Sequence, residues 1–122
     1  MFNSKPGYCT KKGVVYSIEC AECTKLGKKP KYFGETARTG YERMREHITL
    51  LENHPDKSAL GDHLKEEHNG NRCEFKMKLV SKHFKPLERQ CSEALQITEY
   101  KDGKVLNRRG EFGENLTQIL AF

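Results

Sequence analysis

Two sets of side chains in this sequence have the types and spacing that chemistry needs. The first set combines phenols, a guanidinium, an imidazole, a carboxylate and an amide: Tyr16, Tyr32, Arg43, His47, Glu93 and Asn107. The second set holds only metal-ligating types: Cys20, Cys23, His63 and His68. The two sets alternate along the chain, so one fold must position both of them.

Arg43 and His47 form a basic pair at helical spacing. Residues four apart project from one helix face, about one turn apart, and we expect this face to lie beside the apolar stripe and not on it. A guanidinium stays charged and can hold two phosphate oxygens, so the pair could meet one phosphate. Taken alone, such a pair is more often a solvated helix face.

Glu93 lies among small and apolar residues in a predicted helix, where a carboxylate needs a partner. Mg²⁺ or Mn²⁺ is such a partner, because hard cations are held by one or two carboxylates together with waters and substrate phosphate. An ion pair with Arg89, one helical turn earlier, is an equally good interpretation of Glu93 alone.

Tyr16 and Tyr32 are predicted on neighbouring strands, where their hydroxyls could converge if the register permits. Tyrosines at such strand positions are more often core aromatics than catalytic residues. A phenol with a reference pKa near 10 is a poor base unless a metal-bound water or nearby charge assists it. Asn107 could simply close a turn.

The Cys/His set predicts a closed, tetrahedral structural zinc site. Cys20-x-x-Cys23 falls in a predicted loop, and His63 and His68 fall near the end of a predicted helix. The long separation between the two pairs indicates a site that joins two parts of a fold, unlike a finger module. A reduced cysteine pair with two surface histidines is the alternative.

Three further cysteines complete the count of five. Cys73 could replace one histidine as a ligand, whereas Cys9 and Cys91 are expected to be bystanders, with Cys91 buried. An odd number of cysteines in a reducing compartment favours metal ligation over disulfides.

Periodicity predicts the elements that carry these residues. Strands are expected at 13–19, 31–35 and 74–81, helices at 40–53, 58–69 and 86–101, an edge segment at 104–107 and a last helical turn at 115–120, with a Lys/Gly loop at 24–30. Ser58 caps the second helix and Asn69-Gly70 ends it. The fold class is therefore α+β, a small three-stranded mixed or antiparallel sheet flanked by helices.

Length, charge and hydrophobicity limit the number of domains and the kinds of partner that the chain can have. A chain of 122 residues fits one domain, expected at 13–122 after an extension at 1–12, and 35% hydrophobic residues leave a thin core that a metal would reinforce. The net charge of +5 favours nucleic acid, with Lys11-Lys12, Lys28-Lys29 and Arg108-Arg109 as candidate phosphate contacts or solubilising charge. No apolar run suggests a membrane span or signal peptide, so we expect a soluble, intracellular protein.

The order of the first set resembles the GIY-YIG nuclease family. There a first strand ends in tyrosine, a second carries Tyr-x-Gly, a helix supplies Arg-x-x-x-His, and a later helix gives a metal-binding glutamate followed by an asparagine. Tyr16, Tyr32, Gly34, Arg43, His47, Glu93 and Asn107 match in order over 13–107. The chain departs at Val14-Val15, where Gly-Ile is typical, and at Phe33, where Ile is typical.

The resemblance implies a DNA endonuclease in which water attacks phosphorus in line, leaving a 5′-phosphate and a 3′-hydroxyl. Arg43 would hold the phosphate, Glu93 would hold Mg²⁺, and either Tyr16 or His47 would help deprotonate the water. Which of the two is the base stays open.

A CxxC between the tyrosine motifs and a later histidine pair is similar to the endonuclease domain of Penelope-like retroelements. That resemblance implies a nuclear protein that nicks double-stranded DNA, and a reverse transcriptase domain in a parent polyprotein. The alternatives are a zinc-stabilised, non-catalytic DNA-binding module and a stand-alone repair or restriction nuclease.

Overall fold

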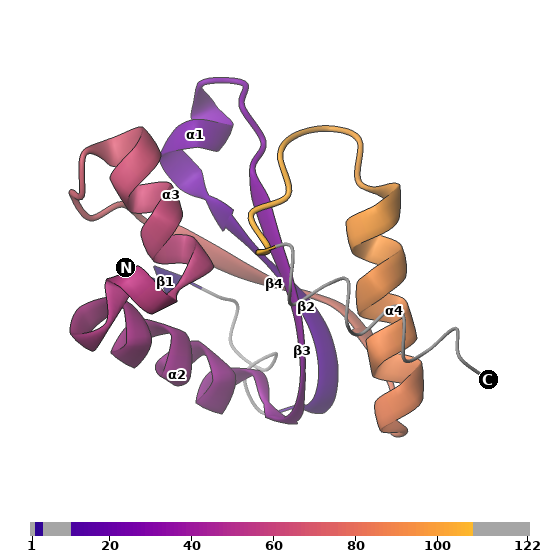
Figure 1. Cartoon of the computed structure of the whole chain (residues 1–122). Coiled ribbons are helices and arrows are strands. Elements are labelled where there is room, and N and C mark those ends of the chain that lie inside the picture. Colours follow the sequence, from indigo (N-terminus) through magenta and orange to yellow (C-terminus); the bar gives the residue numbers. More distant parts are fainter. Residues whose placement is uncertain (1, 4–10, 109–122) are drawn as a thin grey trace.

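The computed structural model describes residues 2–3 and 11–108 (Figure 1). Along the chain the elements are β1 (Phe2–Asn3), β2 (Lys12–Cys20), α1 (Ala21–Lys25), β3 (Lys31–Thr39), α2 (Gly40–Asn53), the 3₁₀ helix η2 (Pro55–Lys57), α3 (Ala59–His68), β4 (Phe75–Lys82) and α4 (Pro86–Glu99). The predicted α+β class is confirmed.

The sheet has the strand order β1-β4-β2-β3, with β2 antiparallel to both of its neighbours. The sequence predicted three strands, and the structure adds β1, which pairs in parallel with Phe75 and Lys76 of β4. Two residues are too few to carry a period-2 pattern, so this strand had no signal. Part of the expected N-terminal extension at 1–12 therefore belongs to the sheet.

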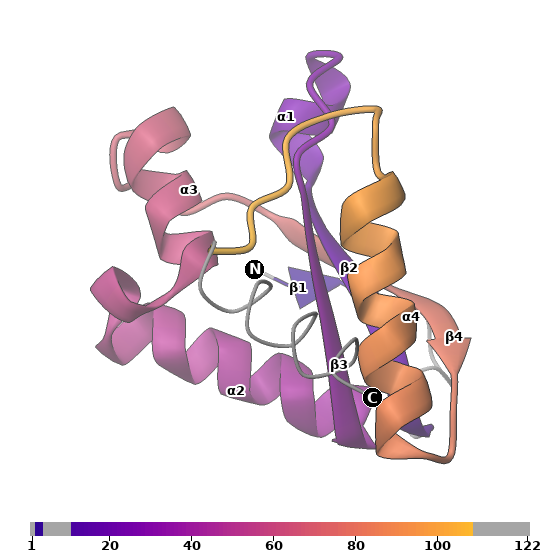
Figure 2. The ribbon, with the colours of Figure 1, turned by 45° about the vertical axis from the view of Figure 1, so that its right-hand side comes forward.

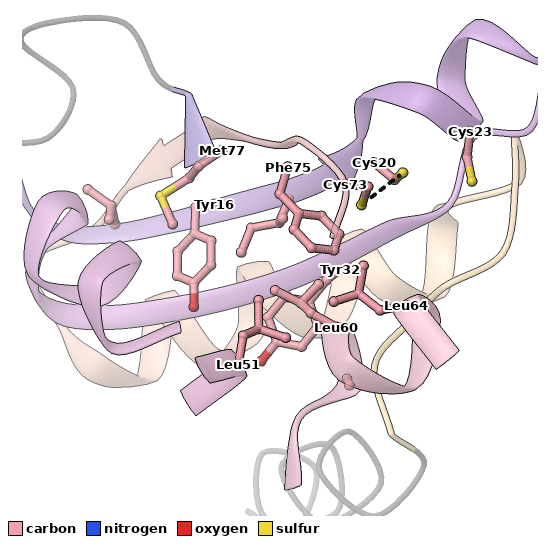
Figure 3. Packing of buried hydrophobic residues seen from close by; sticks show 13 residues of the cluster. Tyr16, Cys20, Cys23, Tyr32, Leu51, Leu60, Leu64, Cys73, Phe75 and Met77 are labelled. Carbon is pink, nitrogen blue, oxygen red and sulfur yellow. Dashed lines mark hydrogen bonds between the residues drawn. The ribbon is translucent and has the colours of Figure 1, made fainter. Parts of the chain in front are cut away.

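Helices cover both faces of the sheet, with α2 and α3 on one side and α4 on the other (Figures 1 and 2). Central strand β2 is consequently buried along nearly its whole length. Alternate residues point to opposite faces, so Tyr16 and Ile18 join Leu51 and Leu60 in the main core. Figure 3 shows this cluster between the sheet and the two helices.

The helix ends follow local chemistry. The Thr39 hydroxyl accepts a hydrogen bond from the Glu42 amide at 3.1 Å and starts α2. Ser58 caps α3 through the Gly61 amide at 3.3 Å, and Asn69 ends it in the left-handed conformation with φ of 54°. The predicted cap and stop of α3 are confirmed.

Three segments differ from the prediction. The CxxC segment, expected to be a loop, closes β2 and continues as helix α1, and Pro55 begins a 3₁₀ turn. The edge segment at 104–107 forms a single bridge, between Val105 and Lys31. The helical turn expected at 115–120 and Cys9 lie outside the described residues. Within the described part of the chain, no helix is long and apolar enough to cross a membrane.

Candidate active site and metal cluster

The Cys/His set converges at the end of the sheet where β2 passes into α1. Cys20 ends β2, Cys23 lies in α1, and His63 and His68 lie in α3. Their four ligand atoms all fall within 4.8 Å of one another. The alternative placed both histidines on the surface, and that part is wrong, because His63 is buried and His68 partly buried beside the two cysteines.

Four of the six distances between these atoms are close to the edges of a tetrahedron around one ion. Cys20 Sγ lies 3.3 Å and Cys23 Sγ 3.6 Å from His68 Nε2, and His63 Nε2 lies 3.6 Å from Cys23 Sγ and 3.2 Å from His68 Nε2. Zinc bonds of about 2.3 Å to sulfur and 2.05 Å to nitrogen give tetrahedral edges of roughly 3.3 to 3.8 Å. Two thiolates and two imidazoles within 4.8 Å of one another are a donor set that could hold a metal ion such as Zn²⁺.

Neighbouring groups support the cluster. Glu22 Oε2 lies 3.4 Å from His68 Nδ1, the nitrogen that faces away from the ligand atoms, in the manner of a carboxylate that orients a metal-bound imidazole. Burial lowers the pKa of His63, which favours the neutral form that binds metal. Cys73 Sγ lies 3.5 Å from Cys20 Sγ (Figure 3) but is outside the four-residue group. Cys91, expected to be buried, is only partly so.

On the same face of the sheet, Arg43 and His47 of α2 meet Tyr16 of β2. Arg43 Nε donates to Tyr16 Oη at 3.0 Å, and Tyr16 Oη lies 2.8 Å from His47 Nε2. The phenol donates to Nε2 when the His47 proton is on Nδ1, and accepts from Nε2 in the other tautomer. The result is a hydrogen-bonded chain from guanidinium through hydroxyl to imidazole.

His47 was expected beside the apolar stripe of its helix, and that expectation is wrong. Its side chain is buried, and Tyr32 packs edge-on against it with ring centroids 5.3 Å apart. Burial, reinforced by the charge of Arg43, lowers the pKa of His47 to about 3, so the imidazole is neutral at physiological pH. Arg43 keeps about a third of its side chain exposed at 32%.

The strand register brings the two tyrosines together. Tyr16 pairs with Gly34, and Ile18 pairs with Tyr32, so both phenols stand on one face as diagonal neighbours. Both are also buried. Burial raises the pKa of Tyr16 above its usual range, the nearby Tyr32 adds to this, and Arg43 opposes it. The Tyr16 phenol therefore stays protonated at neutral pH.

Glu93 lies on α4 and is partly buried. Its negative charge contributes to the raised pKa of Tyr16, after the larger effects of burial and Tyr32, so the carboxylate acts within electrostatic range of the phenol. Arg89, the alternative partner considered for Glu93, is instead bound to Glu35, with 2.9 Å between Nε and Oε2.

Asn107 holds the outer strand of the sheet. Its Oδ1 accepts from the Phe33 amide at 2.9 Å, and its Nδ2 donates to the Phe33 carbonyl at 2.7 Å. Phe33 lies between the two residues that form the Tyr-x-Gly motif on β3. These contacts tie Asn107 to the strand segment that carries Tyr32 and Gly34. A direct role at the catalytic site stays a prediction.

Sequence reasoning missed the importance of Arg89. The side chain is buried, with Nε on Glu35 and Nη1 donating to the carbonyls of His83 and Phe84 at 3.1 Å each. Arg108, one member of the Arg108-Arg109 pair that was a candidate phosphate contact, donates from Nε to Asp62 at 3.0 Å. No local pattern marked the Arg89 guanidinium as buried, because the sequence neighbours of Arg89 are Glu88 and Gln90 and its partner Glu35 lies 54 positions away.

Comparisons of the chain with protein-family models, with curated proteins and with solved structures found no match.

Proposed function

We propose that this domain is a metal-dependent DNA endonuclease of the GIY-YIG type, with a structural zinc site. The observation that carries the proposal is the hydrogen-bonded chain Arg43–Tyr16–His47, assembled from two elements, with the charge of Glu93 acting on its central phenol. Neither a solvated helix face nor an ordinary aromatic core requires a guanidinium, a phenol and a neutral imidazole joined one to the next by hydrogen bonds.

Arg43 is the catalytic residue that meets the substrate first. It is the exposed member of the chain, whereas Tyr16 lies fully buried beneath it. A phosphodiester would pair with the guanidinium and draw it outward, which uncovers the Tyr16 hydroxyl. Loss of such a donor commonly costs about a hundredfold or more in rate, because the donor offsets the negative charge that builds on the phosphate oxygens in the transition state.

Tyr16 and His47 would act together on the attacking water. The water gives a proton to Tyr16 Oη as the phenol passes its own proton to His47 Nε2, and the new oxygen–phosphorus bond replaces the bond to the 3′ oxygen. The 3′ oxygen takes a proton from solvent, and His47 returns one to solvent. Burial is the larger cause of the low pKa of His47 and Arg43 the smaller; substrate phosphate would offset the Arg43 part, making the imidazole a better acceptor.

Glu93 is the residue that would hold Mg²⁺ or Mn²⁺. A partly buried carboxylate whose charge acts on Tyr16, the phenol that Arg43 binds, offers the oxygen ligand that these hard cations prefer. When bound, the ion supplies Lewis-acid neutralisation of charge on the scissile phosphate.

The zinc cluster is the feature that favours one branch of the family. Zinc held by the CxxC after β2 and by two histidines of α3 is the pattern that resembles the endonuclease domain of Penelope-like retroelements. On that basis the domain would nick double-stranded DNA in the nucleus, next to a reverse transcriptase domain of a parent polyprotein that uses the new 3′ end as a primer.

The test is a nicking assay on supercoiled plasmid with Mg²⁺, with Mn²⁺ and with neither. Arg43→Ala and Glu93→Ala should each lower nicking at least a hundredfold while the fold is retained. Arg45→Ala and Glu99→Ala are matched controls, since both residues are exposed on the same helices, and they should nick normally. DNA binding without cleavage under every metal condition would identify a non-catalytic binding module.

A further inference from the structure

Phe84 is the most exposed large apolar side chain in the described part of the chain, at 97%, and it sits at the tip of the turn between β4 and α4. An exposed phenylalanine forgoes the favourable free energy of burying its ring, and Phe84 is not part of the hydrophobic core. Single exposed apolar side chains are common, so what distinguishes Phe84 is how its turn is held and which charges surround it.

The turn that carries Phe84 is rigidly braced. The His83 amide donates to the Gly13 carbonyl at 2.8 Å, and Arg89 holds the carbonyls of His83 and Phe84 while its other face binds Glu35. Gly13 has a φ of +68°, and a Cβ there would lie 2.8 Å from the His83 oxygen, so only glycine permits this approach. The buried Arg89 thus fixes the backbone of the turn that exposes the Phe84 ring.

The surroundings of the ring are basic. Lys82 and Lys85 flank it in sequence, and the exposed Lys11 and Lys12 precede Gly13 on the adjacent strand. Glu88 is the nearby exposed acid, 3.9 Å from His83. Cations around an aromatic tip suit a polyanion that offers flat apolar faces, which describes nucleic acid better than a protein surface.

The turn also lies at the end of the sheet from which α2 begins, as Figure 2 shows. The Gly40 amide donates to the Lys11 carbonyl at 3.2 Å, tying the start of α2 to the start of β2. Tyr16 is three residues along β2 from Gly13, roughly 10 Å at the usual rise per residue. These hydrogen bonds place the turn and the start of α2 at the same end of β2.

We propose that this turn is a nucleic-acid wedge, in which Phe84 stacks on an unpaired or unstacked base while Lys11, Lys12, Lys82 and Lys85 bind the neighbouring phosphates. The proposal rests on the proposed function for its choice of DNA. It adds a preference to that function, because stacking on a base is easiest where pairing is already interrupted. The preferred substrate would then be DNA with a locally opened or distorted duplex.

The experiment measures binding of the full chain to two fluorescent duplexes by anisotropy, in Ca²⁺ without Mg²⁺. One duplex is fully paired and the other has a central run of mismatches. Phe84→Ala should weaken binding to the mismatched duplex about tenfold and to the paired duplex less, whereas Phe84→Trp should preserve it. Replacing Lys82 and Lys85 by alanine should weaken both and reduce the salt dependence by about two ions.

Leu26→Ala is the matched control, because Leu26 is also exposed, at 76%, beside lysines, but lies near the zinc cluster. It should change neither affinity. Unchanged binding by Phe84→Ala, or an equal loss with Leu26→Ala, would overturn the wedge. Altered self-association with unaltered DNA affinity would assign Phe84 to a protein contact instead.

The two proposals fail separately. Loss of binding in Phe84→Ala together with absence of nicking in the wild type would leave the wedge standing and remove the nuclease. Normal nicking together with unchanged binding in Phe84→Ala would do the reverse.

Discussion

The ring of Tyr16 lies directly over Gly34 on the neighbouring strand, so closely that a Cβ on Gly34 would overlap the hydroxyl oxygen and the carbon that bears it. The Tyr-x-Gly motif is thus explained by packing. Gly34 is the position on β3 opposite Tyr16, and its missing side chain lets the phenol pass outward to Arg43 and His47.

Gly34→Ala should therefore disturb the site at its centre. The added methyl group must displace a fully buried ring in a packed core, which commonly costs about 1–3 kcal/mol. Urea unfolding measures the cost. In a Tyr16→Ala background the same substitution should cost far less, and equal costs in the two backgrounds would show that the overlap with Tyr16 is irrelevant.

The zinc cluster predicts different results for two nearby cysteines. Cys20→Ala should remove a ligand, lowering bound zinc from about one per chain and lowering the melting temperature, because metal affinity contributes folding free energy. Cys73→Ala should keep the zinc, since the four ligands are complete without it. Elemental analysis with thermal melting provides the measurement. Zinc loss only in Cys73→Ala would move Cys73 into the ligand set.

His47 should make stability depend on pH. Its pKa is depressed from 6.5 to about 3 in the folded protein, so the folded state stays unprotonated where the unfolded state takes up a proton. The contribution of neutral His47 to the free energy of unfolding is complete above about pH 6.5. It is lost as pH falls toward 3, by up to about 1.4 kcal/mol per pH unit.

His47→Gln can still accept from Tyr16 but cannot titrate, so its unfolding free energy should fall less steeply with acid than that of the wild type. His54→Gln, an exposed substitution near the end of the same helix, should keep the wild-type slope. His63 and His68 are present in all three proteins, so their titration cancels in the comparison. Parallel pH profiles for wild type and His47→Gln would contradict the buried, neutral imidazole.

Elements governed by local signals were predictable from the sequence. The period of α2 together with Pro55, and the Ser58 cap with the Asn69 stop of α3, gave boundaries that the structure reproduces. Helix α1 was not predictable, because five residues cannot sustain a helix alone. It is held from outside, by the Ala21 amide donating to the Glu74 carbonyl at 2.9 Å.

The membership of the metal cluster followed from residue types and spacing, because thiolates and imidazoles have few other reasons to gather. The environment of His47 did not, since its burial depends on the hydroxyl that β2 supplies 31 positions earlier. Arg89 likewise became interpretable only through Glu35, 54 positions away. Long-range partners, and not local propensity, decide whether a charged or titratable side chain is exposed.

Asn107 provides the sharpest distinction between a positioning residue and a catalytic one. Its amide makes two hydrogen bonds to the Phe33 backbone, so Asn107→Ala should cost roughly 1–3 kcal/mol of stability. Asn107→Asp keeps the acceptor for the Phe33 amide but sets a carboxylate against the Phe33 carbonyl, so it should be no more stable than the alanine variant. If Asn107 acts through β3, the loss of nicking in these variants should follow their loss of folded structure, and nicking should recover at lower temperature. A variant that is folded at the assay temperature yet nicks a hundredfold more slowly would instead place the amide in contact with substrate.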